Sequence, residues 1–125
     1  MSDGGRTRMM DALVGLDIEQ RGEIVIARLE GELDIARAPS IGERIGDSVP
    51  TSARGLVVDM LPLEFIDSSG IAMLFGLARR LGGRRQELRV VAAEGGPVRR
   101  VLDIVEFDRA APIHTDVDGA LNSIA

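Results

Sequence analysis

A short run of carboxylate and hydroxyl side chains, Asp67, Ser68 and Ser69, is the part of this sequence best suited to chemistry. Apolar residues then recur with the spacing of one helix face, at Ile71, Leu74, Phe75 and Ala78. The run therefore stands at the start of a predicted helix, where free N–H groups and the helix dipole favour negative charge. A serine there is well placed to carry a phosphate. The same residue types are common helix caps, so a purely structural role also stays open.

The two serines together with His114, the only histidine, raise a second chemistry, that of a serine hydrolase. The G-x-S-x-G turn that presents such a nucleophile is absent. Ile66 stands where Ser68 would need the first glycine, and Asp67 stands there for Ser69. His114 also fits the polar end of a strand. A catalytic triad is therefore the weaker interpretation.

Three aspartates follow predicted strand ends, and carboxylates there have several possible uses. Asp34, Asp59 and Asp67 could together hold Mg²⁺, although their spacing does not require it and separate turn residues are the commoner explanation. Asp59 could also be the phosphoacceptor of a receiver domain. Such a domain is expected to carry a late lysine, and all 15 basic residues here are arginine. We therefore predict no metal site.

Four arginines surround the predicted end of the helix that Ser68 begins: Arg79, Arg80, Arg84 and Arg85. They could bind a phosphate or an acidic partner. They also suit the negative end of the helix dipole, and a solvated helix end is the simpler interpretation.

Composition excludes several classes of function. The net charge of −5 and the absence of Trp and Tyr argue against nucleic-acid binding. Without lysine there is no Walker-A motif and no Schiff base, and without cysteine there is no thiolate nucleophile. No run of 18 apolar residues and no signal peptide is seen, so we expect a cytoplasmic protein that does not insert into a membrane.

The hydrophobic pattern predicts the order β-β-α-β-α-β-α-β-α. The two first strands form a hairpin with its turn at Arg21 and Gly22. The predicted strands cover residues 13–19, 23–29, 55–60, 88–93 and 111–114. The predicted helices cover residues 39–49, 68–81 and 97–105, with Val105 on the core face, and a last one from a capping box at Thr115 and Asp118 to Ile124. Alternating elements of this kind predict a mixed sheet with helical crossovers. Residues 1–12 are predicted to be a flexible tail, and residues 13–125 one α/β domain.

Two motifs about thirty residues apart resemble the STAS domain, and more narrowly the bacterial anti-sigma factor antagonists. They are Gly31-Glu32-Leu33-Asp34 and Phe65-Ile66-Asp67-Ser68-Ser69-Gly70. The resemblance spans roughly residues 13–124 and both motifs match without departure. It implies the STAS fold, a mixed β-sheet with an N-terminal hairpin and about four α-helices mainly on one side.

The resemblance also implies a non-enzymatic function in partner switching. In this family the protein binds an anti-sigma factor that is also a serine kinase, and so frees a sigma factor. Phosphorylation of the serine after the motif aspartate, here Ser68, ends the interaction, and a metal-dependent serine phosphatase restores it. No cofactor is implied, since ATP and Mg²⁺ belong to the kinase.

The implied partner-binding residues are Asp34, Asp67, Ser68, Ser69 and Gly70. A bulky residue at Gly70 is expected to impair phosphorylation more than stability.

Other family roles stay open: a STAS subunit that docks on an ABC-transporter ATPase in lipid trafficking, or nucleotide binding. A small hydrolase that uses Ser68 is the third alternative. The oligomeric state is not predicted.

Overall fold

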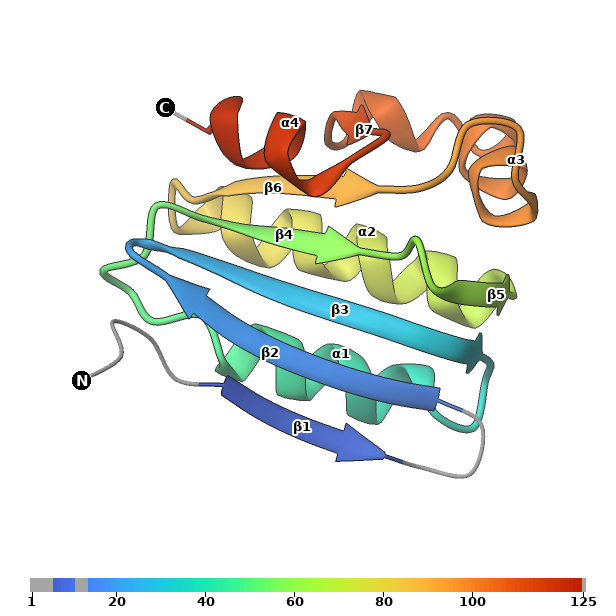
Figure 1. Cartoon of the computed structure of the whole chain (residues 1–125), viewed down its shortest axis with the longest axis horizontal. Coiled ribbons are helices and arrows are strands. Elements are labelled where there is room, and N and C mark those ends of the chain that lie inside the picture. The colour runs from blue at the N-terminus through green and yellow to red at the C-terminus, as the bar shows by residue number, and fades with distance from the viewer. Residues whose placement is uncertain (1–5, 11–13, 125) are drawn as a thin grey trace.

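The computed structural model describes residues 6–10, by their backbone alone, and residues 14–124. In this part of the chain seven strands form one mixed sheet in the order β1-β2-β3-β4-β6-β7, with β5 also beside β3 (Figure 1). The strands are β1 (Arg6–Met10), β2 (Val14–Arg21), β3 (Ile24–Leu33), β4 (Gly55–Asp59), β5 (Leu63–Ile66), β6 (Glu87–Val91) and β7 (Ile113–His114). The helices are α1 (Ala38–Asp47), α2 (Ser68–Gly83), α3 (Pro97–Ile104) and α4 (Val117–Asn122), with a 3₁₀ turn at Phe107–Arg109.

The predicted N-terminal hairpin is confirmed. Strands β2 and β3 pair antiparallel, and Arg21 faces Ile24 across a turn that contains Gly22. Gly22 has a φ of +62°, which glycine adopts without the steric cost that other residues incur. The remaining pairings of β3, β4, β5, β6 and β7 are parallel, so the sheet is mixed as expected.

Strand β3 changes partner along its length, and this change positions the site. Its first half pairs with β4 over Ile24 to Arg28, and its end pairs with β5 over Gly31 to Leu33. The register shifts between Gly31 and Glu32, and Gly31 has a φ of +90°. A β-bulge with this backbone geometry favours glycine. The glycine of the first motif therefore lets β3 leave β4 and end beside β5.

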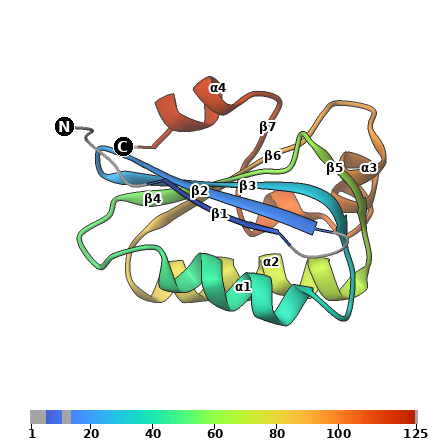
Figure 2. The same cartoon turned by 60° about the horizontal axis from the view of Figure 1, so that its bottom comes forward.

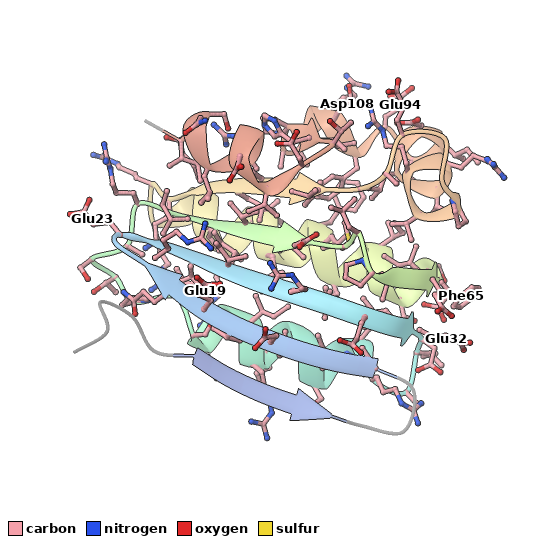
Figure 3. All side chains as sticks on the ribbon, viewed as in Figure 1. Glu19, Glu23, Glu32, Phe65, Glu94 and Asp108 are labelled. Carbon is pink, nitrogen blue, oxygen red and sulfur yellow. The ribbon has the colours of Figure 1, made fainter. Side chains whose placement is uncertain are left out.

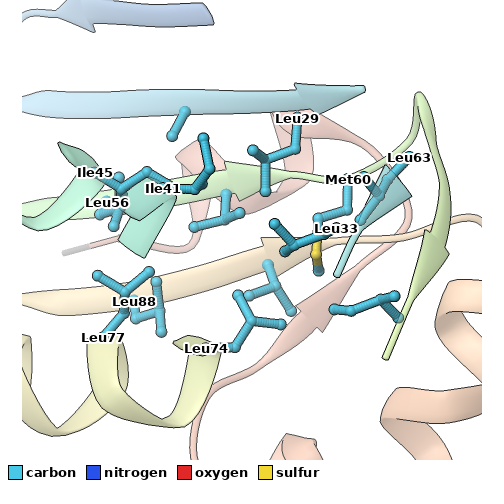
Figure 4. Packing of buried hydrophobic residues seen from close by; sticks show 14 of the residues in the cluster. Leu29, Leu33, Ile41, Ile45, Leu56, Met60, Leu63, Leu74, Leu77 and Leu88 are labelled. Carbon is cyan, nitrogen blue, oxygen red and sulfur yellow. The ribbon is translucent and has the colours of Figure 1, made fainter. Parts of the chain in front are cut away.

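Two layers of helix cover the sheet unequally. Helices α1 and α2 lie on one face, and α4 lies on the other (Figure 2). The larger core joins the sheet to α1, α2 and α3 and includes the fully buried Leu29, Leu33, Ile41, Ile45, Leu56 and Leu74 (Figure 4). A smaller cluster under α4 contains Ile26, Val57, Val91, Ala120 and Ile124. The expectation of helices mainly on one side is therefore confirmed.

The N-terminal segment differs from its prediction. Residues 6–10, placed in a flexible tail by the sequence, form β1, which pairs antiparallel with β2. The sequence Arg-Thr-Arg-Met-Met shows no alternation, so the strand is defined by backbone pairing with the edge of β2 rather than by a side-chain pattern. Residues 1–5, 11 and 12 of the predicted tail lie outside the described residues. The domain boundary at residue 13 stays a prediction.

Two local predictions also need correction. The capping residue of α4 is Asp116 rather than Thr115, because the Asp116 Oδ1 accepts a hydrogen bond from the Gly119 N–H at 2.6 Å. Val105, predicted in the core, is 37% exposed. Helix α3 ends at Ile104, before Val105 could complete the buried stripe.

Strand β5 was not predicted at all, since its residues show the burial pattern buried, exposed, exposed, buried instead of alternation. The remaining predicted elements are present with ends that differ by a few residues. In the described part of the chain, no helix combines the length and the apolar character that crossing a membrane requires.

Candidate functional site

The fold brings the two sequence motifs together at one edge of the sheet. Asp34 follows β3 and Asp67 follows β5, and these strands are parallel neighbours whose last residues, Leu33 and Ile66, pair in register. The two loops therefore leave the sheet side by side (Figure 1). We call the residues Asp34, Ile35, Phe65, Asp67 and Ser68 the Ser68 edge.

Asp67 ties the two loops to each other and to α2. Its Oδ1 caps the helix by accepting hydrogen bonds from the N–H groups of Ser69 at 2.9 Å and Gly70 at 3.1 Å. Its Oδ2 accepts a hydrogen bond from the Ile35 N–H at 3.1 Å. Its own N–H donates to the Leu33 carbonyl at 3.3 Å. The structural role of a cap, left open by the sequence, thus belongs to Asp67.

The two serines of the motif have different surroundings. Ser68 is the exposed first residue of α2, and its hydroxyl makes no hydrogen bond with any described residue. Ser69 is half-buried and lines a groove of about 450 Å³ between α1 and α2. The geometry presents the Ser68 hydroxyl to a partner more openly than that of Ser69. This difference agrees with Ser68 as the phosphoacceptor, which stays a prediction.

Asp34 shapes its own loop. Its Oδ1 accepts hydrogen bonds from the Ala36 N–H at 3.1 Å and from the Arg37 guanidinium at 3.2 Å. Its carbonyl accepts from the N–H groups of Arg37 and Ala38, where α1 begins. Asp34 is half-buried, so one part of it remains available to a partner.

Gly70 lies beneath this surface. A Cβ atom there would stand 2.5 Å from Ile66 Cγ1 and 3.1 Å from Leu33 Cδ2. Added atoms would therefore force the start of α2 away from the sheet. This packing contradicts the expectation that a bulky residue at Gly70 impairs phosphorylation more than stability. Its part in partner binding stays a prediction.

Sequence reasoning missed two apolar side chains at the Ser68 edge. Ile35 is 73% exposed and Phe65 is 47% exposed, although both are large hydrophobic residues. Phe65 pairs in register with Glu32, and both lie at the free end of β3 and β5 (Figure 3). The sequence holds one indication of the exposed Ile35: this apolar residue precedes the apolar stripe of α1 and belongs to no predicted strand or helix.

The serine-hydrolase interpretation is not supported by the positions of its residues. His114 lies on β7, and β4 and β6 separate β7 from β3, the strand beside the Ser68 edge. Neighbouring strands stand about 4.8 Å apart, so the sheet alone places these strands about 14 Å from each other. The His114 Nε2 is buried and has no hydrogen-bond partner among the described residues. The structure does not bring His114 to Ser68.

The three aspartates do not converge on one site. Asp59 pairs with Arg28, whose Nε lies 2.9 Å from the Asp59 Oδ2, and the Asp59 Oδ1 accepts from the Leu61 N–H at 3.0 Å. Asp34 and Asp67 are engaged in the two loops as described. Among residues 14–124, no group of three or more His, Asp or Glu side chains is arranged to hold a metal ion.

The arginine cluster lies at the other end of α2. Arg80 forms an ion pair with Asp47 at 3.0 Å, and Arg84 donates to the Val49 carbonyl at 3.2 Å. Arg79 and Arg85 are exposed to solvent. Two of the four arginines therefore join α2 to the end of α1, and the cluster takes no part in the Ser68 edge.

With this fold and these loops, the chain belongs to the STAS domain family, which it matches over residues 15–120. Its relatives include the anti-sigma-F factor antagonist RsfB of Mycobacterium tuberculosis, 23% identical over 112 residues that cover 89% of both chains. The family members that it resembles are thus named as regulatory proteins.

Solved structures that are similar to this chain include further anti-sigma factor antagonists. An anti-sigma factor antagonist from Mycobacterium paratuberculosis is 28% identical, with a TM-score of 0.80 over 89% of this chain and 93% of that one. The phosphorylated form of SpoIIAA, a Bacillus cell fate determinant, has a TM-score of 0.62 over 97% of this chain and all of its own, at 20% identity. The latter similarity shows that the fold is shared.

Proposed function

We propose that this protein is an anti-sigma factor antagonist, which binds an anti-sigma factor with serine kinase activity and so releases a sigma factor. The observation that carries the proposal is the Ser68 edge, where Asp67 holds an exposed serine at a helix start beside the loop of Asp34. The names of the relatives support the same role. Phosphorylation of Ser68 ends the interaction, and a metal-dependent phosphatase restores it.

The geometry indicates how a phosphate on Ser68 would act. A helix start tolerates negative charge, so the domain has no reason to unfold. The nearest helix donors, the N–H groups of Ser69 and Gly70, already donate to Asp67. A phosphate therefore remains on the outer side of the helix, where it obstructs the partner and adds about two negative charges at neutral pH.

The proposed role is that of a substrate of other enzymes rather than of a catalyst. The kinase supplies ATP and Mg²⁺, and this chain supplies the hydroxyl. No nucleic acid and no membrane insertion are involved, and the proposed location is the cytoplasm, where sigma factors act. Glu32, in the first motif, and Glu64, just before the second, are exposed near the Ser68 edge, which does not favour a polyanion as its ligand.

Phosphosite mapping tests the proposal. The purified protein is incubated with each kinase-type anti-sigma factor of the source genome, ATP and Mg²⁺, and the products are mapped by mass spectrometry. We expect one phosphate on Ser68, its loss in Ser68→Ala and its retention in Ser69→Ala. Phosphate on Ser69, or none with any of these kinases, would contradict the proposal. Co-purification with an ABC-transporter ATPase instead would favour the alternative role.

A further inference from the structure

Two exposed apolar side chains lie at the Ser68 edge and belong to neither hydrophobic core cluster. Ile35 stands 73% exposed in the loop after β3, and Phe65 stands 47% exposed on β5. Among the residues with described side chains, five large hydrophobic residues are at least 37% exposed, and these two belong to the segments that carry the two motifs. Their exposure costs hydration free energy in the free protein, which a partner that covers them would recover.

The backbone holds both side chains close to the phosphoacceptor. The Ile35 N–H donates to the carboxylate of Asp67, the residue before Ser68. Phe65 lies one residue before the position where β5 last pairs with β3. Phe65 pairs with Glu32, which stands three residues before Ile35, so the two apolar residues lie on neighbouring segments. The Asp67 bridge fixes the loop in advance, which lowers the entropy lost on binding.

Charges around these residues define the kind of partner. Glu32 and Glu64 are exposed beside Phe65, and Asp34 and Asp67 stand in the loops. The one basic residue of segments 31–37 and 63–70 is Arg37, whose guanidinium donates to Asp34. Within these two segments, the apolar side chains therefore stand among acidic ones. This surface fits a protein with an apolar pocket bordered by basic side chains.

We propose that Ile35 and Phe65 are the anchors that the anti-sigma factor buries, and that Glu32 and Glu64 guide its approach. This inference rests on the proposed function and adds the residues that determine affinity. It also gives a physical reason for release. An apolar contact must exclude water, and a phosphate on Ser68 keeps its water because transfer of a charged group into such a contact is costly.

Binding kinetics separate the two roles. The association and dissociation rates are measured by surface plasmon resonance with the purified anti-sigma factor that phosphorylates this protein. Burial of an anchor acts mainly on dissociation, so we expect Ile35→Thr and Phe65→Thr each to raise the dissociation rate about tenfold or more. Charges at an interface border act mainly on association, so Glu32→Gln with Glu64→Gln should slow association and reduce its dependence on salt.

The matched control is Ile104→Thr. Ile104 is the same residue type as Ile35 with almost the same exposure, 76%, and it ends α3, which packs against β5 but carries neither motif. We expect its dissociation rate to equal that of the unaltered protein. Circular dichroism and thermal unfolding should show that all three threonine variants fold.

Each other outcome overturns the inference in a recognisable way. If the unaltered protein binds and the Ile35 and Phe65 variants dissociate no faster, or the Ile104 variant dissociates equally fast, the anchors are wrong and the proposed function stands. If the unaltered protein binds no anti-sigma factor, the proposed function fails together with the inference. Ile35-dependent dimerisation by light scattering, or Ile35-dependent sedimentation with phosphatidylethanolamine–phosphatidylglycerol vesicles, would assign the surface to another occupant.

Discussion

Carboxylates are used in opposite ways in two regions of this molecule. At the Ser68 edge, Asp67 accepts hydrogen bonds from backbone N–H groups and holds two loops in place. On the face of the sheet that carries α4, Asp17, Arg28 and Asp59 form a row across β2, β3 and β4, which we call the Arg28 row. There the carboxylates face a guanidinium.

The difference shows what each region can do. The side chains of Asp17 and Asp59 are 11% and 4% exposed, and the Arg28 Nε lies 2.9 Å from the Asp59 Oδ2. Charges that are buried against each other leave little for a partner to recognise. A carboxylate that is satisfied by the backbone instead orders a surface whose other groups, Ser68 and Ile35, remain exposed. We therefore assign the Arg28 row a role in stability, whereas recognition is the role proposed for the Ser68 edge.

The largest expected effect on stability comes from breaking the Arg28 row. Arg28→Met removes the guanidinium that faces the nearly buried Asp59 carboxylate and should lower the free energy of unfolding by about 3 kcal/mol. Urea unfolding followed by circular dichroism measures this loss. Phosphorylation of Ser68 below the unfolding transition should be unchanged. A variant as stable as the unaltered protein would contradict the role given to the row.

Gly70→Ala should have the next largest effect and removes stability at the Ser68 edge itself. The added methyl group meets Ile66 at 2.5 Å, so we expect a loss of about 2 kcal/mol. Gly76→Ala in the same helix is the matched control, because its nearest neighbour is the end of Arg79 at 3.9 Å. That variant should be more stable by about 0.5–1 kcal/mol. Equal changes in the free energy of unfolding at the two glycines would show that helix propensity, and not packing on Ile66, determines the effect of Gly70→Ala.

Asp67→Ala should have a smaller effect on stability and a clear one on the loops. Loss of a helix cap costs about 1 kcal/mol. The Ile35 N–H loses its acceptor as well, so its amide should exchange with solvent faster. Hydrogen exchange followed by NMR measures both the overall stability and the exchange rate of the Ile35 amide. Asp34→Asn is the comparison, since it keeps an oxygen for Ala36 and should leave the Ile35 amide protected. Unchanged exchange at Ile35 in Asp67→Ala would contradict the bridge between the loops.

The central strands and helices could be predicted from the sequence because their residues are buried in regular patterns. Leu56 to Val58 on β4 and the stripe of α2 predict their own burial, and the two motifs mark where the loops lie. The sequence did not predict β1 or β5, whose side chains do not alternate and whose strands exist through pairing with β2 and β3. Strand pairing that is not accompanied by alternating apolar and polar residues has no clear signature in one sequence.

The site was predicted in part for the same reason. Asp67 and Ser68 stand in one motif and could be placed at a helix start from local chemistry alone. The tight packing around Gly70 depends on Ile66 and Leu33, which lie on β5 and β3. The exposure of Ile35 depends on how its loop crosses to Asp67. Such properties belong to the packed fold and not to any local pattern.

The central claim is that a phosphate on Ser68 weakens partner binding without unfolding the domain. The most direct measurement is the dissociation constant, by isothermal titration calorimetry, of the anti-sigma factor with the unmodified protein and with the stoichiometrically Ser68-phosphorylated protein. Forcing charge into such an interface costs at least about 1.4 kcal/mol, so we predict binding at least about tenfold weaker for the phosphorylated protein, with an unchanged circular dichroism spectrum. Equal dissociation constants, or weaker binding that accompanies unfolding, would contradict the account.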